Sequence, residues 1–534
     1  MLPLTTDAAA TAVTNLQVYT FASLTNLVAL FRQAAHVKRN VHPILDGLDG
    51  AHPVLRLAAS TGLVLGLSDR ALPLSSRLQN HLIIALAQIM AMYTSVEWEH
   101  NSHDTLALAL ILSAQSLPLI SPERLEALPL ETLVHLLTIS LVFAFNENDF
   151  VNVASLSRLT ALSLSLLLDS YQGLASAQEC LISLRDLAAR PNPPKPLLFS
   201  TVMIADAVLS SVVYIPPSRY SEITPFTLAH TTLDAFSHMS ALISDFGGVA
   251  STSSDTFREL RKTTYLALDI LASSSCDAFI DQLPYDSLHQ KSFALACIEQ
   301  LVPALSEECI VGKVWGLVEP YLASPALSNR QVYESAHSVV LAIFARVQAE
   351  ALPSPSSKGK AKSTNLAEFS TTLLPSYTQT LIQNSSSDEG LTTTQLCMAF
   401  EATVRCAIVC DSSLSLTSSI LDQLIDAAKT CASEEQAHRL HLALISSLPA
   451  LPNTEGLLEK MLEECKKIVL ADSDKIELVQ VIYKQLLERV GDLEKEVVVR
   501  WWYENLPIFE ASLGDGEHKQ DSEHSWGDWI RARL

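Results

Sequence analysis

The residues best equipped for chemistry form one short polar cluster, Glu97-Trp98-Glu99-His100-Asn101-Ser102-His103-Asp104. Histidines and carboxylates are the side chains that bind zinc and transfer protons. A metal site also needs further side chains that hold its ligands in place, and nothing in the surrounding sequence supplies them. We therefore favour a structural interpretation, in which one helix ends, a polar loop follows and the next helix begins.

Nine cysteines are scattered along the chain without paired spacing. Cys406 and Cys410 stand four residues apart, which places both on one face of a helix. A four-cysteine zinc site needs a second pair, which the sequence lacks, so we interpret both as ordinary core cysteines. The odd number and irregular spacing indicate no disulfide framework and fit a reducing compartment.

The short motifs of common enzymes do not occur in the sequence. There is no Gly-x-x-x-x-Gly-Lys phosphate loop, no Gly-x-Gly-x-x-Gly turn, no Gly-x-Ser-x-Gly elbow and no His-Glu-x-x-His pair. We therefore predict no catalytic, cofactor-binding or metal-binding residues, and a protein that is not an enzyme.

The composition favours a folded, helical and acidic protein. Of the 534 residues, 48% are hydrophobic and 18% charged, which is too apolar for a disordered chain. Only 16 residues are glycine, and low glycine with abundant Leu and Ala suits helices. The formal net charge of -22 argues against general binding to nucleic acid or to anionic lipid.

Apolar side chains recur at helical spacing along the chain. Two such stripes consist of Leu78, Leu82, Leu86, Ile89 and Tyr93, and of Leu130, Leu133, Leu137, Leu141 and Phe145. Helices that are apolar over much of their circumference must be covered on more than one side. We predict an all-α fold, an irregular α-solenoid of HEAT/armadillo-like helical hairpins, with a compact multi-helix bundle as the alternative.

Polar segments divide this helical array. Residues 353–363 are polar, rich in Pro and Ser, and basic, which predicts a disordered linker. This linker separates an N-terminal helical array, 1–352, from a C-terminal array, 364–510, and residues 511–534 form a flexible tail. The sequence Ser433-Glu434-Glu435-Gln436 predicts a helix start with a capping box, in which the Gln436 side chain bonds back to the cap residue.

One segment, Leu197–Ile215, is nearly long enough to span a bilayer, but Asp206 stands at its middle. A central Asp opposes membrane insertion by about 2.5–3.5 kcal/mol, so we predict a helix buried between other helices. Residues 36–42 form a basic spot after the first helix. A second basic spot consists of Arg258, Arg261 and Lys262. We interpret both as solvated helix ends, with lipid head groups or an acidic partner as the alternative ligands.

Trp501 and Trp502 are adjacent on a predicted helix near the C-terminus. Because adjacent helical side chains point in different directions, we expect one of them in the core and the other on the surface. A surface tryptophan is either simply packed there or faces a groove or a partner.

The targeting information is expected at the C-terminus. Residues 1–7 show no basic segment followed by an apolar core, so no secretory signal is predicted there. The chain ends in Ala532-Arg533-Leu534, which matches the small residue, basic residue, leucine and free carboxylate of a peroxisomal address. The carboxylate supplies a charged anchor, Arg533 a positive charge and Leu534 an apolar contact. The alternative interpretation is an amphipathic final helix whose apolar residues within 526–530 pack on the body.

A long, Leu-rich helical chain with this ending resembles the fungal peroxisomal biogenesis factor 8 (peroxin-8) family. The segment Tyr333-Glu334-Ser335-Ala336-His337-Ser338-Val339-Val340-Leu341 is similar to a helical segment of that family, and Arg500-Trp501-Trp502 also resembles it. The general character extends over nearly the whole chain, whereas these strings cover little of it. Members of the family also carry an N-terminal address, for which this chain offers no good match.

The resemblance implies a non-catalytic scaffold, peripheral on the matrix side of the peroxisomal membrane. Its partners would be the import receptor, bound through the C-terminal tripeptide, and the docking and RING-finger complexes, which it would bridge. From the residues themselves we expect no cofactor, no nucleic-acid partner and no transmembrane span. Two alternatives stay open: a cytosolic helical-repeat adaptor with a chance tail match, and an all-helical peroxisomal matrix enzyme. The second alternative predicts a pocket with converging polar groups.

Overall fold

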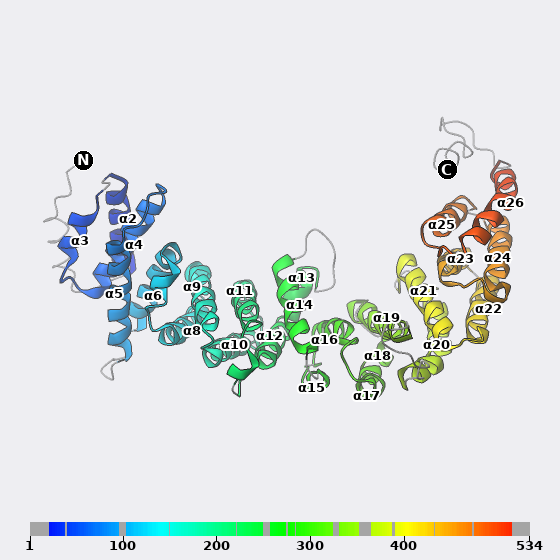
Figure 1. The fold of residues 1–534 in the computed structure, drawn as a ribbon, viewed down its shortest axis with the longest axis horizontal. Helices are drawn as coiled ribbons and strands as arrows, with labels where there is room; N and C mark the ends of the chain where they lie inside the picture. Colours follow the sequence, from blue (N-terminus) through cyan, green and yellow to red (C-terminus); the bar gives the residue numbers. More distant parts are fainter. Residues whose placement is uncertain are drawn as a thin grey trace. The chain divides into compact units, whose positions relative to one another are not determined.

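The structure of the chain is a computed structural model (Figure 1). It describes residues 21–37, 40–94, 103–148, 150–220, 222–248, 257–273, 276–283, 285–323, 330–351, 365–386, 390–431, 433–472 and 475–514. Every regular element within these ranges is a helix, which confirms the predicted all-α class. The chain divides into two compact units, unit 1 (Met1–Ser274) and unit 2 (Ser275–Leu534).

Unit 1 contains thirteen α-helices within its described ranges, joined by short connections. They are α2 (Phe21–Val37), α3 (His42–Leu48), α4 (Pro53–Ser68), α5 (Ser76–Thr94), α6 (His103–Ser116), α7 (Pro122–Leu125), α8 (Leu130–Asn146), α9 (Phe150–Asp169), α10 (Leu174–Ala188), α11 (Lys195–Val212), α12 (Pro225–His238), α13 (Ser240–Asp245) and α14 (Arg258–Ala272). Short 3-10 helices follow α6 and α11.

Unit 2 also consists of helices within its own described ranges. Its α-helices are α15 (Asp277–Ile280), α16 (Leu288–Leu301), α17 (Glu307–Cys309), α18 (Trp315–Val318), α19 (Arg330–Ala351), α20 (Asn365–Asn384), α21 (Thr393–Cys410), α22 (Ser415–Thr430), α23 (Glu434–Ser447), α24 (Leu457–Ala471), α25 (Lys475–Glu488) and α26 (Lys495–Gly514). A π-helix, η4 (Ile310–Val314), joins α17 to α18, and the predicted linker 353–363 lies outside the described residues.

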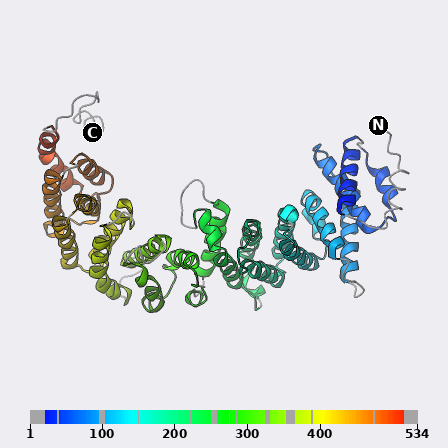
Figure 2. The same ribbon diagram turned by 180° about the vertical axis from the view of Figure 1, so that it is seen from behind.

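Each unit is a stack in which a helix packs against the next helix but one. In unit 1, α8, α10 and α12 form one layer and α9 and α11 lie in a second layer (Figures 1 and 2). In unit 2, α19, α21, α23 and α25 form one layer, and α20 and α22 belong to the other. The helices that flank the predicted linker, α19 and α20, belong to the same unit.

Hydrogen bonds between helices of one layer show the length of the repeat. His135 of α8 bonds to Glu179 of α10, 44 positions later, and Ser157 of α9 bonds to Ser200 of α11, 43 positions later. In unit 2, Ser292 and Ser335 are also 43 positions apart. HEAT and armadillo repeats are about 40–47 residues long, so these spacings support an irregular solenoid of that kind.

The predicted apolar stripes are largely buried between the helices of the stack. Leu78, Leu82 and Leu86 of α5 are fully buried, and so are Leu133, Leu137 and Leu141 of α8. The predicted helix start at Ser433 is confirmed, because its side chain accepts from the backbone N–H of Gln436. The prediction of a reciprocal capping bond from the Gln436 side chain was wrong. The Gln436 amide instead donates to the Oγ of Ser385 at the end of α20, 3.0 Å away.

The close approach of α2 and α4 depends on two glycines. A Cβ added at Gly62 would lie 2.4 Å from the carbonyl oxygen of Val28, and one at Gly66 would lie 2.4 Å from that of Arg32. Neither contact is possible between real atoms, so α2 rests directly on the backbone of α4 at these two turns.

Replacing Gly66 with alanine is expected to lower the free energy of unfolding by about 1–3 kcal/mol, because α2 must move away from α4. This loss exceeds the gain of about 1 kcal/mol in helix propensity. The matched control is Gly316→Ala in α18, where no heavy atom lies within 4 Å of the added Cβ, and it should be neutral or stabilising. Urea denaturation followed by circular dichroism measures both. Equal stability of the two variants would show that the glycine contact is unnecessary.

Candidate functional site

The predicted targeting residues Ala532, Arg533 and Leu534 lie outside the described residues, and their role stays a prediction. The last described element is α26, which ends at Gly514.

The two adjacent tryptophans of α26 are both buried, at 7% and 5% exposure. The Trp501 indole donates to the Oε1 of Glu463 on α24, 2.8 Å away, while the Trp502 ring packs on Tyr483 of α25. The expectation that one of them stands on the surface was wrong, because α26 contacts both α24 and α25 and each neighbour covers one ring.

The polar cluster predicted at 97–104 falls mostly outside the described residues, with α6 beginning at His103. Elsewhere, the Asp472 carboxylate forms hydrogen bonds with two histidines of α23. His441 donates to one Asp472 oxygen at 2.7 Å and His438 to the other at 3.3 Å, and the second nitrogen of His438 lies 3.2 Å from Glu477. No group of three or more potential ligands in the described ranges has the arrangement of a metal site. This cluster therefore joins α23 to the end of α24 and to the start of α25.

The cysteine pair of α21 is a hydrogen-bonded pair of thiols. The Sγ atoms of Cys406 and Cys410 are 3.9 Å apart, and Cys410 also lies 3.7 Å from the carbonyl oxygen of Ala367 on α20. The hydrogen bond from Cys406 lowers the pKa of Cys410 to about 7 and raises that of Cys406. Cys406 is fully buried, as expected for a core cysteine, and Cys410 is half-buried.

Helix α11 contains most of the segment 197–215, which was predicted to be buried rather than membrane-spanning. By length and composition α11 is the one described helix able to cross a bilayer, and 61% of it is buried inside the protein. Its central Asp206 pairs with Lys262 of α14 at 3.1 Å. One residue of the predicted basic spot thus neutralises the acid that opposed membrane insertion.

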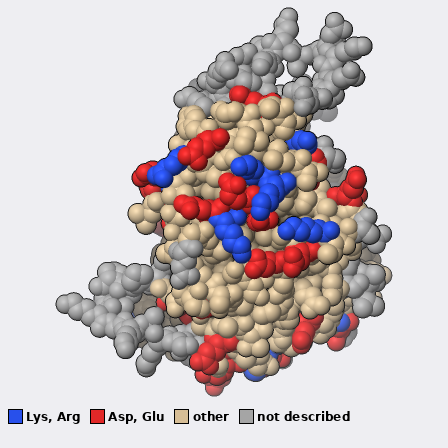
Figure 3. All heavy atoms as spheres, turned by 90° about the vertical axis from the view of Figure 1, so that its right-hand side faces the viewer, with Lys and Arg blue, Asp and Glu red and all other residues tan. Residues whose placement is uncertain are grey.

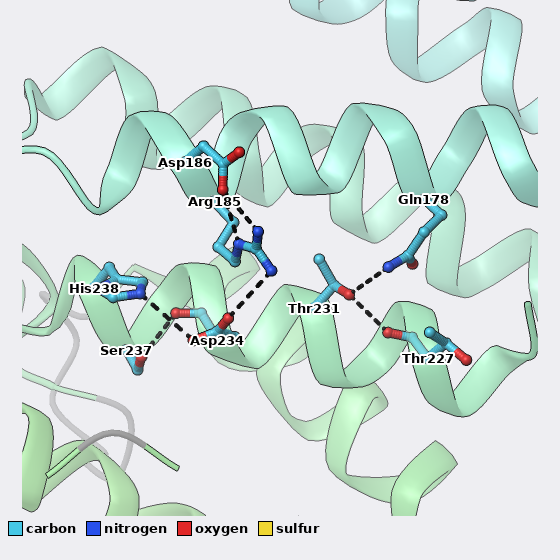
Figure 4. A network of polar contacts seen from close by, with 8 residues as sticks. All are labelled: Gln178, Arg185, Asp186, Thr227, Thr231, Asp234, Ser237 and His238. Carbon is cyan, nitrogen blue, oxygen red and sulfur yellow. Dashed lines mark hydrogen bonds and ion pairs between the residues drawn. The ribbon is translucent and has the colours of Figure 1, made fainter. Parts of the chain in front are cut away.

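A serine, a histidine and an aspartate stand together on α12, the residue types of a hydrolytic triad (Figure 4). The geometry is not catalytic: the hydroxyl of Ser237 donates to the backbone carbonyl of Asp234 at 2.7 Å, and not to His238. The Asp234 carboxylate instead lies 3.6 Å from His238 and 3.8 Å from Arg185 of α10. A nucleophile must bond to its base, so this network only joins the two helices.

The same pair of helices is joined again one turn earlier on α12 and two turns earlier on α10. The Gln178 amide of α10 donates to the hydroxyl of Thr231 at 2.9 Å, and Thr231 in turn donates to the carbonyl of Thr227 (Figure 4). Arg185 also pairs with its neighbour Asp186 at 2.8 Å. Polar contacts of this kind hold successive repeats in register.

A small hollow lies beside α16 and α18 in unit 2, with a volume of about 90 Å³. Its polar side chains are Tyr285, Lys291 and Tyr321. The Tyr285 hydroxyl donates to the carbonyl of Ile280, and the Lys291 ammonium lies 5.7 Å from the Tyr321 ring. Small-molecule sites usually enclose about 300–1,000 Å³, so this hollow does not provide the pocket that an enzyme requires.

The segment 333–341, which carried the family resemblance, forms the middle of α19. Tyr333 and His337 are buried there, with their rings 4.6 Å apart. His337 Nδ1 lies 2.8 Å from the hydroxyl of Tyr377 on α20, and burial lowers the pKa of His337 to about 3. This string is therefore part of the core of unit 2.

The described residues define an all-α helical-repeat protein of the HEAT/armadillo-like kind, whose polar clusters join helices to one another. Residues 270–345 match the family model described as the PEX8 central TPR-like domain. This match supports a relationship of the chain to the peroxin-8 family. It also supports a role as an import-related peroxin and an association with the peroxisome.

Chains of several solved structures are similar to this chain. The crystal structure of Kap121p bound to Pho4p is similar at 12% sequence identity and a TM-score of 0.33. The similarity covers 95% of this chain, which spans 55% of the length of that one. No curated protein matches the chain.

Proposed function

We propose that this protein is a peroxisome-biogenesis scaffold for matrix protein import. It bridges the docking and RING-finger complexes and binds the import receptor on the matrix side of the membrane, to which it is peripheral. The observation that carries this proposal is the family match over 270–345, a segment that runs from the last residues of α14 through most of α19.

The fold supports binding rather than catalysis. Stacked helices expose long side surfaces along which a partner segment can lie. Some clusters in the described ranges contain residue types found in catalytic sites. Their polar atoms form hydrogen bonds between and within helices, as those of Ser237 and Asp472 do. The family comparison and the helical-repeat fold both point to a scaffold without enzymatic activity.

The C-terminal tripeptide supplies the route to the receptor. We expect Leu534 to fill an apolar pocket and its carboxylate to anchor the chain, so both must be free.

Removing Leu534 from the full chain, labelled at its N-terminus, should move the fluorescence from peroxisomes to the cytosol. Leu534→Met is the matched control, because it keeps the apolar side chain and the terminal carboxylate. Peroxisomal location of the truncated chain would contradict a dominant tail signal.

Carriage on a partner can mimic a working signal, so binding is measured separately. The purified chain should bind the import receptor at least about tenfold more weakly without Leu534, a difference of about 1.4 kcal/mol. Affinity capture of the full chain then tests the bridging role. Recovery of docking and RING-finger components supports it, and recovery of cytosolic partners alone favours an adaptor with a chance tail match.

A further inference from the structure

Charges on the side of unit 2 where α22 and α24 lie are balanced. Figure 3 views this side and shows basic and acidic side chains interspersed. The two helices carry four lysines and five acids. Lys429 of α22 and Lys467 of α24, for example, share Glu464 at 3.7 and 2.6 Å. An acidic partner gains little on such a surface, because the neighbouring carboxylates repel it.

A different arrangement lies on α21. Its single acid, Glu401, has a side chain only 9% exposed, and two arginines converge on its Oε1. Arg405 lies one turn further along α21 at 2.9 Å, and Arg489 reaches across from the end of α25 at 2.6 Å. Both arginine side chains are exposed, at 41% and 45%. One carboxylate balances one of the two positive charges, so a cationic site faces solvent on a chain of net charge -22.

Beyond its first turn, and apart from Arg405 itself, the open stripe of α21 is apolar. The helix packs on α19, α20, α22 and α23, and its uncovered stripe presents Met398 at 58% and Val409 at 38% exposure. The stripe continues onto α19, whose Gln348 amide contacts the carbonyl of Ala402, 3.4 Å away, next to the exposed Ala345 and Ala349. Two arginines therefore stand beside an apolar track that spans two helices.

We propose that this surface of α19, α21 and the end of α25 is a docking site for an acidic, partly apolar segment of a partner protein. The apolar side chains of the segment cover Met398 and Val409, and its carboxylates pair with the guanidinium groups of Arg405 and Arg489. Guanidinium groups suit this ligand because each can bind a carboxylate with two parallel hydrogen bonds. The inference rests on the geometry of unit 2 and not on the proposed function.

The test uses the full chain and a fluorescein-labelled 15-residue peptide of glutamate and leucine, with the leucines at helical spacing. Fluorescence anisotropy should show binding that weakens as salt rises from 50 to 300 mM. Arg489→Gln and Arg405→Gln should each weaken binding about fivefold, as expected for the loss of a half-exposed ion pair. Each of these variants leaves one arginine on Glu401, so no buried charge is left unpaired.

Glu401→Gln provides the opposite change. It frees both arginines from their internal carboxylate, so the acidic peptide should bind about threefold more tightly. A purely structural role of this ion cluster predicts no gain.

The matched controls are Lys467→Gln and Glu464→Gln, which make the same changes where two lysines share one acid. Both should leave affinity for the peptide within about twofold of the natural chain. Failure of the natural chain to bind overturns the proposal. So does equal loss in Lys467→Gln and Arg489→Gln, or equal binding of a peptide with glutamine in place of glutamate.

Discussion

Replacing Arg439 with methionine should lower the free energy of unfolding of unit 2 by about 2–5 kcal/mol. Arg439 is 5% exposed and donates to the carbonyl oxygens of Ser385, at 3.0 Å, and Leu391. Both acceptors belong to buried residues on the connection between α20 and α21. Methionine fills a similar space without the donors, and each buried carbonyl left unbonded costs about 1–3 kcal/mol.

The measurement is urea denaturation followed by tryptophan fluorescence, since Trp315, Trp501 and Trp502 all belong to unit 2. Arg330→Met is the control, because this exposed arginine of α19 pairs with Glu334, one turn away on the same helix. Its loss should cost less than about 1 kcal/mol. If both variants unfold at the same urea concentration, Arg439 does not hold the connection.

The stability of unit 2 should also fall as the pH drops below 6.5, because of His337. Burial lowers the pKa of this histidine to about 3 in the folded chain, from an ordinary value near 6.5. Between these values the unfolded chain binds a proton that the folded chain excludes, so acid favours unfolding. The loss amounts to about 1.4 kcal/mol per pH unit, or about 2 kcal/mol between pH 7 and pH 5.

The readout is the difference in unfolding free energy between pH 7 and pH 5. His337→Phe should remove about 2 kcal/mol of this difference, even though it is less stable at pH 7 after Tyr377 loses its partner. Tyr333→Phe is the control, because it keeps the histidine and should retain the full pH dependence. Burial also lowers the pKa of His230, in unit 1, but that contribution is the same in all three chains. An unchanged pH dependence in His337→Phe would contradict the assignment.

Arg439 and His337 also matter for the proposed role of the protein as a scaffold. A scaffold needs neighbouring repeats held rigidly so that residues from different helices present one surface. Arg439 fixes the connection at α20–α21, and His337 bonds α19 to α20. His337 belongs to α19, a helix of the proposed docking surface, and Arg439 belongs to α23, which packs on α21. Their loss should therefore weaken peptide binding through misplacement of Arg405.

Much of the fold follows from local sequence. Leu78, Leu82 and Leu86 recur at helical spacing, and a helix that is apolar on several sides requires cover on each of them. These conclusions hold because helical periodicity depends on residues three and four positions apart, which a sequence shows directly.

The sequence by itself thus determined an all-helical, acidic, stacked chain, and a C-terminal tripeptide with the form of a peroxisomal address. Only the tertiary structure decided which polar residues meet. Glu401 and Arg489 are 88 positions apart, and the burial of both Trp501 and Trp502 depends on how α26 crosses α24 and α25. Such pairings are set by the packing of helices from distant parts of the chain, and no local pattern of residue types records that packing.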